Sequence, residues 1–168
     1  EPTGERFKAR LVGTGFFQEK GENFVDAYAP VMSVDTLRFV HAVASIKNWS
    51  VPQLDGKNVF LNGAIDYDVH FQPPKGCNIP GGSCWKLKRG LYGLKQAPHI
   101  WFNTMSKVLT DCGYKQSLLE PCLFYRTNLL LVVYVDDILS AGMDQATINQ
   151  EKEVLKLKFV MKGLGHPD

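Results

Sequence analysis

The sequence has no long apolar run and no strong excess of charge of one sign. Its longest apolar run, residues 129–135, has seven residues and stops at two aspartates, whereas a membrane span needs about 20. Lys and Arg number 19 against 17 Asp and Glu, a net charge of +2, far from the balance of a histone-like binder. We therefore expect no membrane anchor, and any contact with nucleic acid must be a local patch.

Cysteine and histidine are few, and they are not spaced as metal ligands usually are. The four cysteines include no C-x-x-C pair and no zinc-knuckle interval, which predicts reduced thiols in an intracellular protein. Only His70, Cys77 and Cys84 could form a metal cluster, and we disfavour it because structural zinc sites have tight ligand pairs. The sequence also lacks a Gly-rich phosphate loop of the P-loop kind, which argues against a phosphohydrolase. It has no initiator Met and no leader, so we expect a piece of a longer polypeptide.

The composition, 45% hydrophobic over 168 residues, suffices for one packed domain or part of one. Strands and helices interleave without strict βαβ alternation, which predicts an α+β fold whose antiparallel sheet carries its helices on one face. Alternating polar and apolar residues predict a strand over 6–11 that places Arg6, Lys8 and Arg10 on one face. Residues 56–61 fit either a bend or one helical turn. The other expected elements are helices at 34–47, from 98 to a stop at 113, and at about 148–159, with strands at 51–55, 69–71, 84–87, 123–126, 129–135 and 138–141.

Two adjacent carboxylates, Asp136 and Asp137, lie between two apolar stretches. Burying unpaired carboxylates costs several kcal/mol, so we expect them at a hairpin tip or beside a cation. Because side chains alternate along a strand, at most one of the two points squarely at a common site, and a plain polar turn remains an alternative. Asp55 closes another short extended segment, and two such strand ends can converge. Carboxylates at adjoining strand ends suit two Mg²⁺ ions in nucleotidyl transfer.

A glycine turn over residues 91–98 leads into a helix and follows three cations, Lys86, Lys88 and Arg89. A helix N-terminus presents free N–H groups and positive potential, which suit a phosphate or a nucleic-acid backbone. An ordinary capped helix after a solvated basic strand explains the same residues equally well.

Taken together, these segments resemble the reverse transcriptase of copia-type LTR retrotransposons, a part of the retrovirus-related Pol polyprotein. The resemblance covers essentially the whole chain, and two of its motifs are highly specific: Leu-Tyr-Gly-Leu-Lys-Gln-Ala-Pro at 91–98 and Tyr-Val-Asp-Asp at 134–137. The remaining matches are residues 8–12 with 15–16, 28–31, 54–63, 72–74, Trp101 and 159–165.

The resemblance implies a polymerase palm with fingers, without the thumb. On that basis residues 1–168 form one partial domain, with fingers-type segments at about 1–50 and 64–100 and palm segments at 51–63 and 101–168. It implies that Asp55 and Asp136 hold two Mg²⁺ ions, for which Mn²⁺ can substitute, and that Asp137 supports them. The implied activity is RNA-directed DNA polymerase: a primer 3′-hydroxyl attacks the α-phosphate of a dNTP.

The resemblance also assigns substrate contacts. Phe60 would lie beneath the incoming sugar and reject a 2′-hydroxyl, although a plain core phenylalanine fits the sequence as well. Arg10 and Lys8 would touch the triphosphate, Tyr92 and Gly93 would line the nucleotide and template pocket, and Lys162 lies near a motif whose lysine protonates pyrophosphate. The residues expected to bind nucleic acid are Arg6, Lys86, Lys88, Arg89 and Lys95.

The implied partners are an RNA or DNA template with its primer, dNTPs, and the thumb, ribonuclease H and integrase regions of the Pol polyprotein. The implied location is intracellular, in cytoplasmic virus-like particles and the nucleus.

Four positions depart from the family pattern. Gly56 follows the first catalytic Asp where a β-branched residue is usual, which loosens the strand. Val59 stands where Ala is usual, and its added methyl groups crowd the site by about 1 to 3 kcal/mol. Thr14 and His99 replace a Lys and an Arg that could meet phosphate. These four departures leave open a second hypothesis: the chain is a catalytically inactive, decayed retroelement fragment with at most non-specific nucleic-acid binding.

Overall fold

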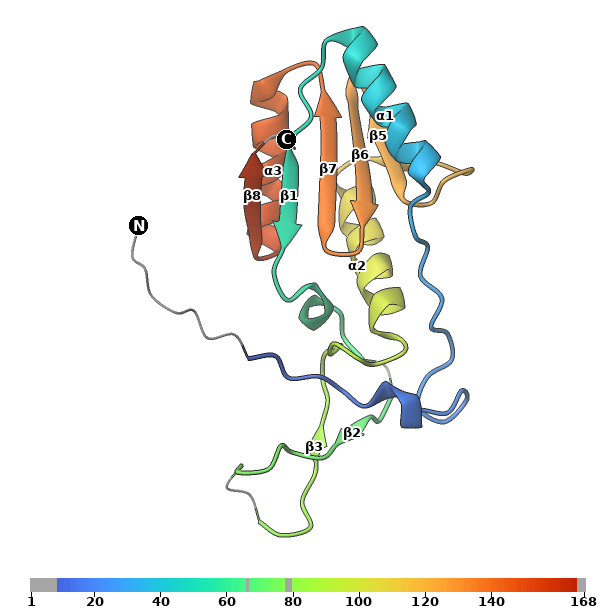
Figure 1. The fold of residues 1–168 in the computed structure, drawn as a ribbon, viewed down its shortest axis with the longest axis vertical. Coiled ribbons are helices and arrows are strands. Elements are labelled where there is room, and N and C mark those ends of the chain that lie inside the picture. The colour runs from blue at the N-terminus through green and yellow to red at the C-terminus, as the bar shows by residue number, and fades with distance from the viewer. Residues whose placement is uncertain (1–8, 66, 78–79, 166–168) are drawn as a thin grey trace, which may run out of the picture.

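A six-stranded antiparallel sheet forms the centre of the protein, with strand order β4-β5-β6-β7-β1-β8 (Figure 1). The computed structural model describes residues 9–65, 67–77 and 80–165. Neighbouring strands pair in antiparallel register throughout this sheet. The strands are β1 (Gln53–Gly56), β4 (Lys115–Gln116), β5 (Leu123–Arg126), β6 (Leu129–Tyr134), β7 (Asp137–Gly142) and β8 (Met161–Gly165).

Three helices pack on this sheet: α1 (Val34–Lys47), α2 (Ala97–Asp111) and α3 (Gln145–Lys158). Local capping signals fix where they start, because the first N–H groups of a helix need side-chain acceptors. The Ser33 hydroxyl accepts a hydrogen bond from the Thr36 N–H at α1, and the Asp144 carboxylate accepts from the first turn of α3. Pro98 occupies the first turn of α2, where its missing N–H costs nothing.

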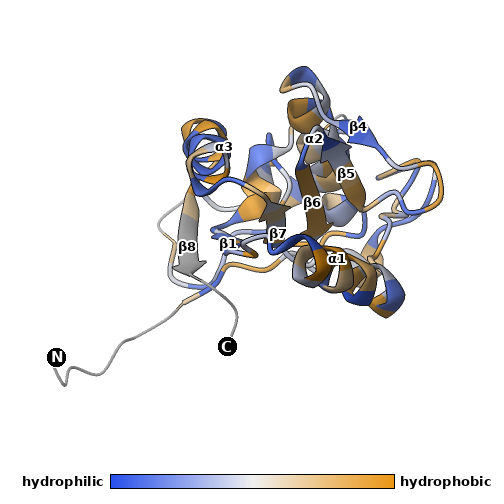
Figure 2. Ribbon diagram, turned by 90° about the horizontal axis from the view of Figure 1, so that it is seen from above, coloured by the Kyte–Doolittle hydropathy of each residue, from blue (hydrophilic) through white to orange (hydrophobic). Residues whose placement is uncertain are grey.

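The helices cover both faces of the sheet, so the prediction that they lie on one face was wrong. Figure 2 shows the sheet between α1 on one side and α2 and α3 on the other. The reason is the composition of β6, in which consecutive apolar residues alternate between two cores. Leu131 and Val133 pack in the larger core with α2 and α3, while Val132 packs with Val40 of α1 in the smaller one. A strand that is apolar on both faces has to be covered on both.

The structure corrects two further predictions and decides one that was left open. Residues 9–12 are irregular rather than the end of a strand, and Arg6 and Lys8 lie outside the described residues. Residues 59–62 form one 3-10 turn, η2 (Val59–Asn62), which resolves the ambiguity of that segment. Strands β4 and β8 were missed, because β4 has only two residues and β8 contains two glycines; each forms by pairing with a neighbouring strand, β5 and β1 respectively.

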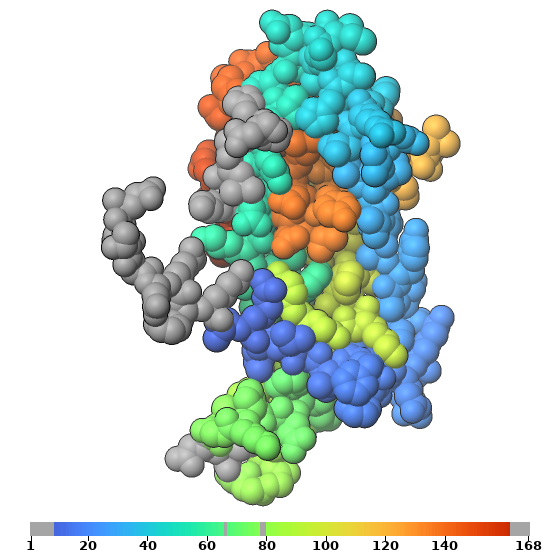
Figure 3. Space-filling model, in the orientation of Figure 1, coloured from blue at the N-terminus to red at the C-terminus, as the bar shows by residue number. Residues whose placement is uncertain are grey.

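A two-stranded arm, made of β2 (His70–Phe71) and β3 (Trp85–Lys86), lies apart from the main sheet. It extends from the end of the molecule, beyond the N-terminal segment that contains the short 3-10 turn η1 (Gly15–Phe17) (Figures 1 and 3). In the described part of the chain, no helix is both long enough and apolar enough to cross a membrane.

Candidate active site

The sheet register brings Asp55 and Asp137 opposite each other. They are Cα partners at the point where β1 ends and β7 begins, so both side chains lie on the same face of the sheet, the face that α1 covers in part. Asp136 immediately precedes β7, and its carbonyl accepts a 2.7 Å hydrogen bond from the Gly56 N–H. All three aspartates therefore lie at adjacent strand ends, although 81 positions separate Asp55 from Asp136 in the sequence.

A two-residue turn, Val135 and Asp136, joins β6 to β7 between the paired residues Tyr134 and Asp137. Val135 has φ 54°, a conformation that β-branched residues rarely adopt and that costs about 1 to 3 kcal/mol. The buried Trp101 of α2 holds this turn by donating its indole N–H to the Val135 carbonyl at 2.5 Å. The larger core thus fixes a strained turn next to the carboxylates.

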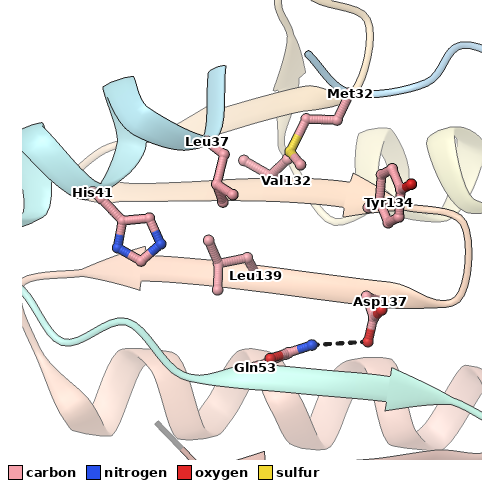
Figure 4. Close-up of a pocket in the computed structure, with 8 residues that line it drawn as sticks. All are labelled: Met32, Leu37, His41, Gln53, Val132, Tyr134, Asp137 and Leu139. Atoms are coloured by element: carbon pink, nitrogen blue, oxygen red, sulfur yellow. Dashed lines mark hydrogen bonds between the residues drawn. The ribbon is translucent and has the colours of Figure 1, made fainter. Parts of the chain in front are cut away.

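Asp137 is fixed from β1, because the Gln53 side-chain amide donates a 2.9 Å hydrogen bond to its carboxylate. These two side chains form the polar end of a hollow of about 230 Å³ between α1 and the sheet (Figure 4). Its other walls are mainly apolar, formed by Met32, Leu37, His41, Val132, Tyr134 and Leu139. Asp137 therefore points away from the core that packs Trp101, toward an open face.

Tyr92 lies within electrostatic reach of the carboxylates. Burial, with the charges of Asp136 and Asp55, raises the pKa of its phenol, and the Arg10 guanidinium opposes this rise. The guanidinium carbon of Arg10 lies 4.8 Å from the centre of the Tyr92 ring. Phe60, only 7% exposed, meets the same ring edge to face at 4.5 Å. Two of the predicted site residues, Phe60 and Arg10, thus contact the ring of a third, Tyr92.

Gly93 positions the N-terminal segment next to this ring. Its φ is +90°, and a Cβ there would lie 2.2 Å from the Gly13 carbonyl oxygen. This close approach allows the Gly13 N–H to donate to the Tyr92 carbonyl at 2.6 Å and the Gly15 N–H to donate to the Gly93 carbonyl at 3.1 Å. The main chain around 92–93 therefore sets where Arg10 lies.

Of the residues predicted to bind nucleic acid, Arg6 lies outside the described residues, and three of the other four make contacts within the protein. The Lys95 ammonium donates to the Gln18 carbonyl at 2.8 Å, and Arg89 donates to the Asn62 carbonyl at 3.0 Å. Lys86 forms a 2.5 Å ion pair with Asp68 on the arm. Lys88 is exposed. Lys162 on β8 is the backbone partner of Asp55 on the side of β1 away from β7.

Gly56 and Val59 fit each other, which changes the interpretation of two departures from the family pattern. A Cβ on Gly56 would lie 2.5 Å from Val59 Cγ1 and 3.1 Å from the Asp136 carbonyl oxygen. Val59 is fully packed, with 1% exposure. The methyl group that was expected to crowd the site thus takes the space that a side chain at 56 would fill.

The donor atoms at this site suit Mg²⁺. Carboxylate oxygens are the ligands that Mg²⁺ prefers, and it is usually held by one or two carboxylates together with substrate phosphates. Asp55 and Asp137 meet in register with Asp136 beside them. Over residues 9–65, 67–77 and 80–165, no three His, Cys, Asp or Glu side chains form a ready-made metal cage.

Sequence reasoning missed two residues that act on the site. Trp101 was noted only as part of a motif, and Gln53 was not considered, yet they hold the turn and Asp137 respectively. The available signal for Gln53 was its place in the strand: it is a polar residue two positions before Asp55, so strand alternation puts both side chains on the same face. The sequence contains no comparable signal for the bond made by Trp101.

Comparison with known proteins finds a matching family and several relatives. Residues 2–167 match the family described as reverse transcriptase (RNA-dependent DNA polymerase). The chain is 34% identical over 167 residues to the Retrovirus-related Pol polyprotein from transposon TNT 1-94 of Nicotiana tabacum, covering 95% of this chain and 13% of that protein. It is 35% identical over 164 residues to the corresponding polyprotein from transposon RE1 of Arabidopsis thaliana, covering 94% and 11%. A more distant relative, the Transposon Ty1-ER2 Gag-Pol polyprotein of Saccharomyces cerevisiae, is 27% identical over 154 residues, covering 88% and 8%.

Proposed function

Because the chain belongs to the reverse transcriptase family of retrotransposon Pol polyproteins, we propose that it performs RNA-directed DNA synthesis. In this reaction a primer 3′-hydroxyl attacks the α-phosphate of a dNTP, and pyrophosphate leaves. The observation that carries the proposal is the register of β1 with β7, which sets Asp55 opposite Asp137 and beside Asp136. Acidic side chains would repel one another at such a place, so their proximity favours a cation-dependent role.

In this proposal Asp55 and Asp136 hold two Mg²⁺ ions with Asp137 in support, and the ions supply charge stabilisation at the transferring phosphoryl group. The chain itself contributes rigid placement. Trp101 fixes the turn that carries Asp136, and Gln53 fixes Asp137. A displacement of about 1 Å at such groups can lower a rate by about 100-fold, so we expect loss of either positioning residue to slow the reaction.

The substrate contacts are proposed around the Tyr92 ring. Arg10, which lies over that ring, would meet the triphosphate together with Lys8. Phe60 meets the same ring edge to face and would exclude the 2′-hydroxyl of a ribonucleotide. Tyr92 and Gly93 would line the nucleotide and template pocket.

The wider context is proposed from the relatives. The chain covers 13% and 11% of the first two relatives, so template, primer and the other Pol regions are partners of the longer protein. The division into fingers-type segments at 1–50 and 64–100 and palm segments at 51–63 and 101–168 is part of this proposal. So are an intracellular location, Lys162 as a residue near the leaving pyrophosphate, and nucleic-acid contacts by Arg6, Lys86, Lys88, Arg89 and Lys95.

The second hypothesis, an inactive remnant, loses part of its basis in the structure. Gly56 and Val59 complement each other rather than disturb the strand. His99, another of the four departures, is integrated into the fold: its Nδ1 lies 2.5 Å from the Tyr28 carbonyl oxygen and its Nε2 lies 2.9 Å from the Asn103 amide nitrogen. Accumulated random changes would be expected to leave misfits at such positions.

Primer extension tests the proposal. The 168-residue chain and a longer polypeptide carrying the thumb are each given poly-rA, an oligo-dT primer, dTTP and Mg²⁺. We expect extension by the longer polypeptide, its abolition by Asp55→Asn or Asp136→Asn, and its retention in the control Asp111→Asn, an exposed acid at the end of α2. Extension that survives both site substitutions, or none by a folded longer polypeptide, would contradict the proposal and leave the inactive remnant.

A further inference from the structure

The β2–β3 arm has a net positive charge larger than that of the whole protein. Residues 67–89 contain four cationic side chains, Lys75, Lys86, Lys88 and Arg89, and one acidic one, Asp68, a net charge of +3. The whole chain has a net charge of +2, so the remainder is slightly acidic. A projecting arm of this kind is an electrostatic footprint for a polyanion.

An aromatic pair lies on the same arm. Phe71 and Trp85 are cross-strand partners whose rings stack at 6.4 Å between centroids with an interplanar angle of 20°. Val69 and Leu87, two residues away on the same strands, are buried and half-buried against the larger core. The pair therefore continues the core outward, and Trp85 at its end is 38% exposed. One face of the indole stacks on the Phe71 ring, and part of the indole surface is exposed to solvent.

The cations of the arm lie near this pair in the sequence. Strand alternation puts His70 and Lys86, which are also cross-strand partners, on the opposite face of the arm. Lys75 lies in the loop that follows β2, and Lys88 lies just after β3; both are exposed, and within the described residues neither forms an ion pair. The arm thus offers a polyanion an exposed aromatic ring and two exposed ammonium groups.

We propose that this arm is a stacking platform for unpaired nucleotides, with Trp85 backed by Phe71 as the base-stacking surface and Lys75 and Lys88 as phosphate contacts. Aromatic surfaces flanked by cations are how proteins hold single strands without reading their sequence, because every base has a π-face. The proposal rests on the proposed polymerase function, which makes the bound strand the unpaired template next to the primer duplex. The stacking pair, rather than the charge alone, distinguishes this surface from a duplex contact.

Binding measurements on the full chain test the platform without requiring catalysis. Fluorescence anisotropy compares a labelled primer–template duplex that is blunt with one that has about eight unpaired template nucleotides. We expect Trp85→Ala to weaken binding of the overhang duplex about 5- to 150-fold and to leave binding of the blunt duplex unchanged. Trp85→Phe keeps a stacking ring and should stay within about threefold of the parent. Tyr125→Ala, which removes a 42% exposed aromatic on β5, is the matched control.

Neutralising Lys75 and Lys88 to Gln provides a second measurement that does not depend on folding of the aromatic pair. Removal of one phosphate contact should reduce the slope of log affinity against log salt by about 0.7 for a single strand. Equal binding of both duplexes by the parent chain, or an equal weakening on both in Trp85→Ala, would overturn the platform, as would unchanged binding in all arm variants. A chain that shows the Trp85 effect but no primer extension would keep the platform and refute the polymerase.

Discussion

Gly56 and Val59 should behave as one coupled pair in a double-mutant cycle. Gly56 does not have a positive φ, so the backbone itself would accept an L side chain there. What opposes a side chain is the 2.5 Å approach of its Cβ to Val59 Cγ1, with the Asp136 carbonyl oxygen at 3.1 Å. Because valine is stiff at χ1, it has little room to withdraw.

The expected magnitudes depend on this close approach. Gly56→Ala alone should lower the free energy of unfolding by about 1 to 3 kcal/mol through overpacking. Val59→Ala alone removes two buried methyl groups and should cost about 1.6 kcal/mol, plus a cavity term. In the double variant the new Cβ at 56 occupies the space that Cγ1 has left, so we expect a loss of at most about 1 kcal/mol and a coupling energy of about 2 kcal/mol.

Urea unfolding of the parent, both single variants and the double variant measures this coupling. A control cycle combines Val59→Ala with Gly142→Ala. Gly142 lies at the far end of β7, and its Cβ would meet Leu129 at 2.7 Å rather than Val59. We expect the control cycle to be additive within about 0.5 kcal/mol. If the changes in unfolding free energy are additive in the Gly56 cycle as well, the packing argument is refuted. Gly56 and Val59 would then be two independent destabilising departures from the family pattern.

Three other perturbations probe the site and its support. Trp101→Phe removes the indole N–H that donates to the Val135 carbonyl, so the free energy of unfolding should fall by about 1 to 3 kcal/mol. Primer extension should fall further than it does in a surface variant that loses the same amount of stability. Phe60→Ala should lower stability by about 3 to 5 kcal/mol, because the ring is 7% exposed; a raised rUTP to dTTP incorporation ratio in the active, longer polypeptide supports the sugar gate, and an unchanged ratio refutes it. Burial alone would raise the pKa of Glu120, but hydrogen bonds from Thr36, Ser33 and Cys122 lower it below its ordinary 4.5. The ionised Glu120 therefore stabilises the folded state above pH 4.5, and this contribution is lost as the pH falls through the lower pKa of the folded state. Glu120→Gln should reduce the acid-side slope of unfolding free energy against pH, and an unchanged slope would contradict this cause.

Local sequence signals determined much of the fold. The bounds predicted for α1 agree with the structure, because Ser33 provides an N-terminal acceptor and Asn48 ends the helix in the left-handed region. The apolar run of β6 and the turn before Asp137 follow in the same way from composition and alternation. Family motifs were recognisable for the same reason, since they are contiguous stretches whose chemistry is visible without a partner.

The tertiary structure decided what depends on residues far apart in the chain. It placed α1 on the second face of the sheet, because both faces of β6 are apolar and a sequence pattern does not say which helix covers which face. It made β8 a strand, although its glycines favour no strand, because β1 offers an unpaired edge. It set Asp55 opposite Asp137, since register depends on packing of the whole sheet. It also matched Gly56 to Val59, because the space available to a side chain is a property of its neighbours and not of the residue itself.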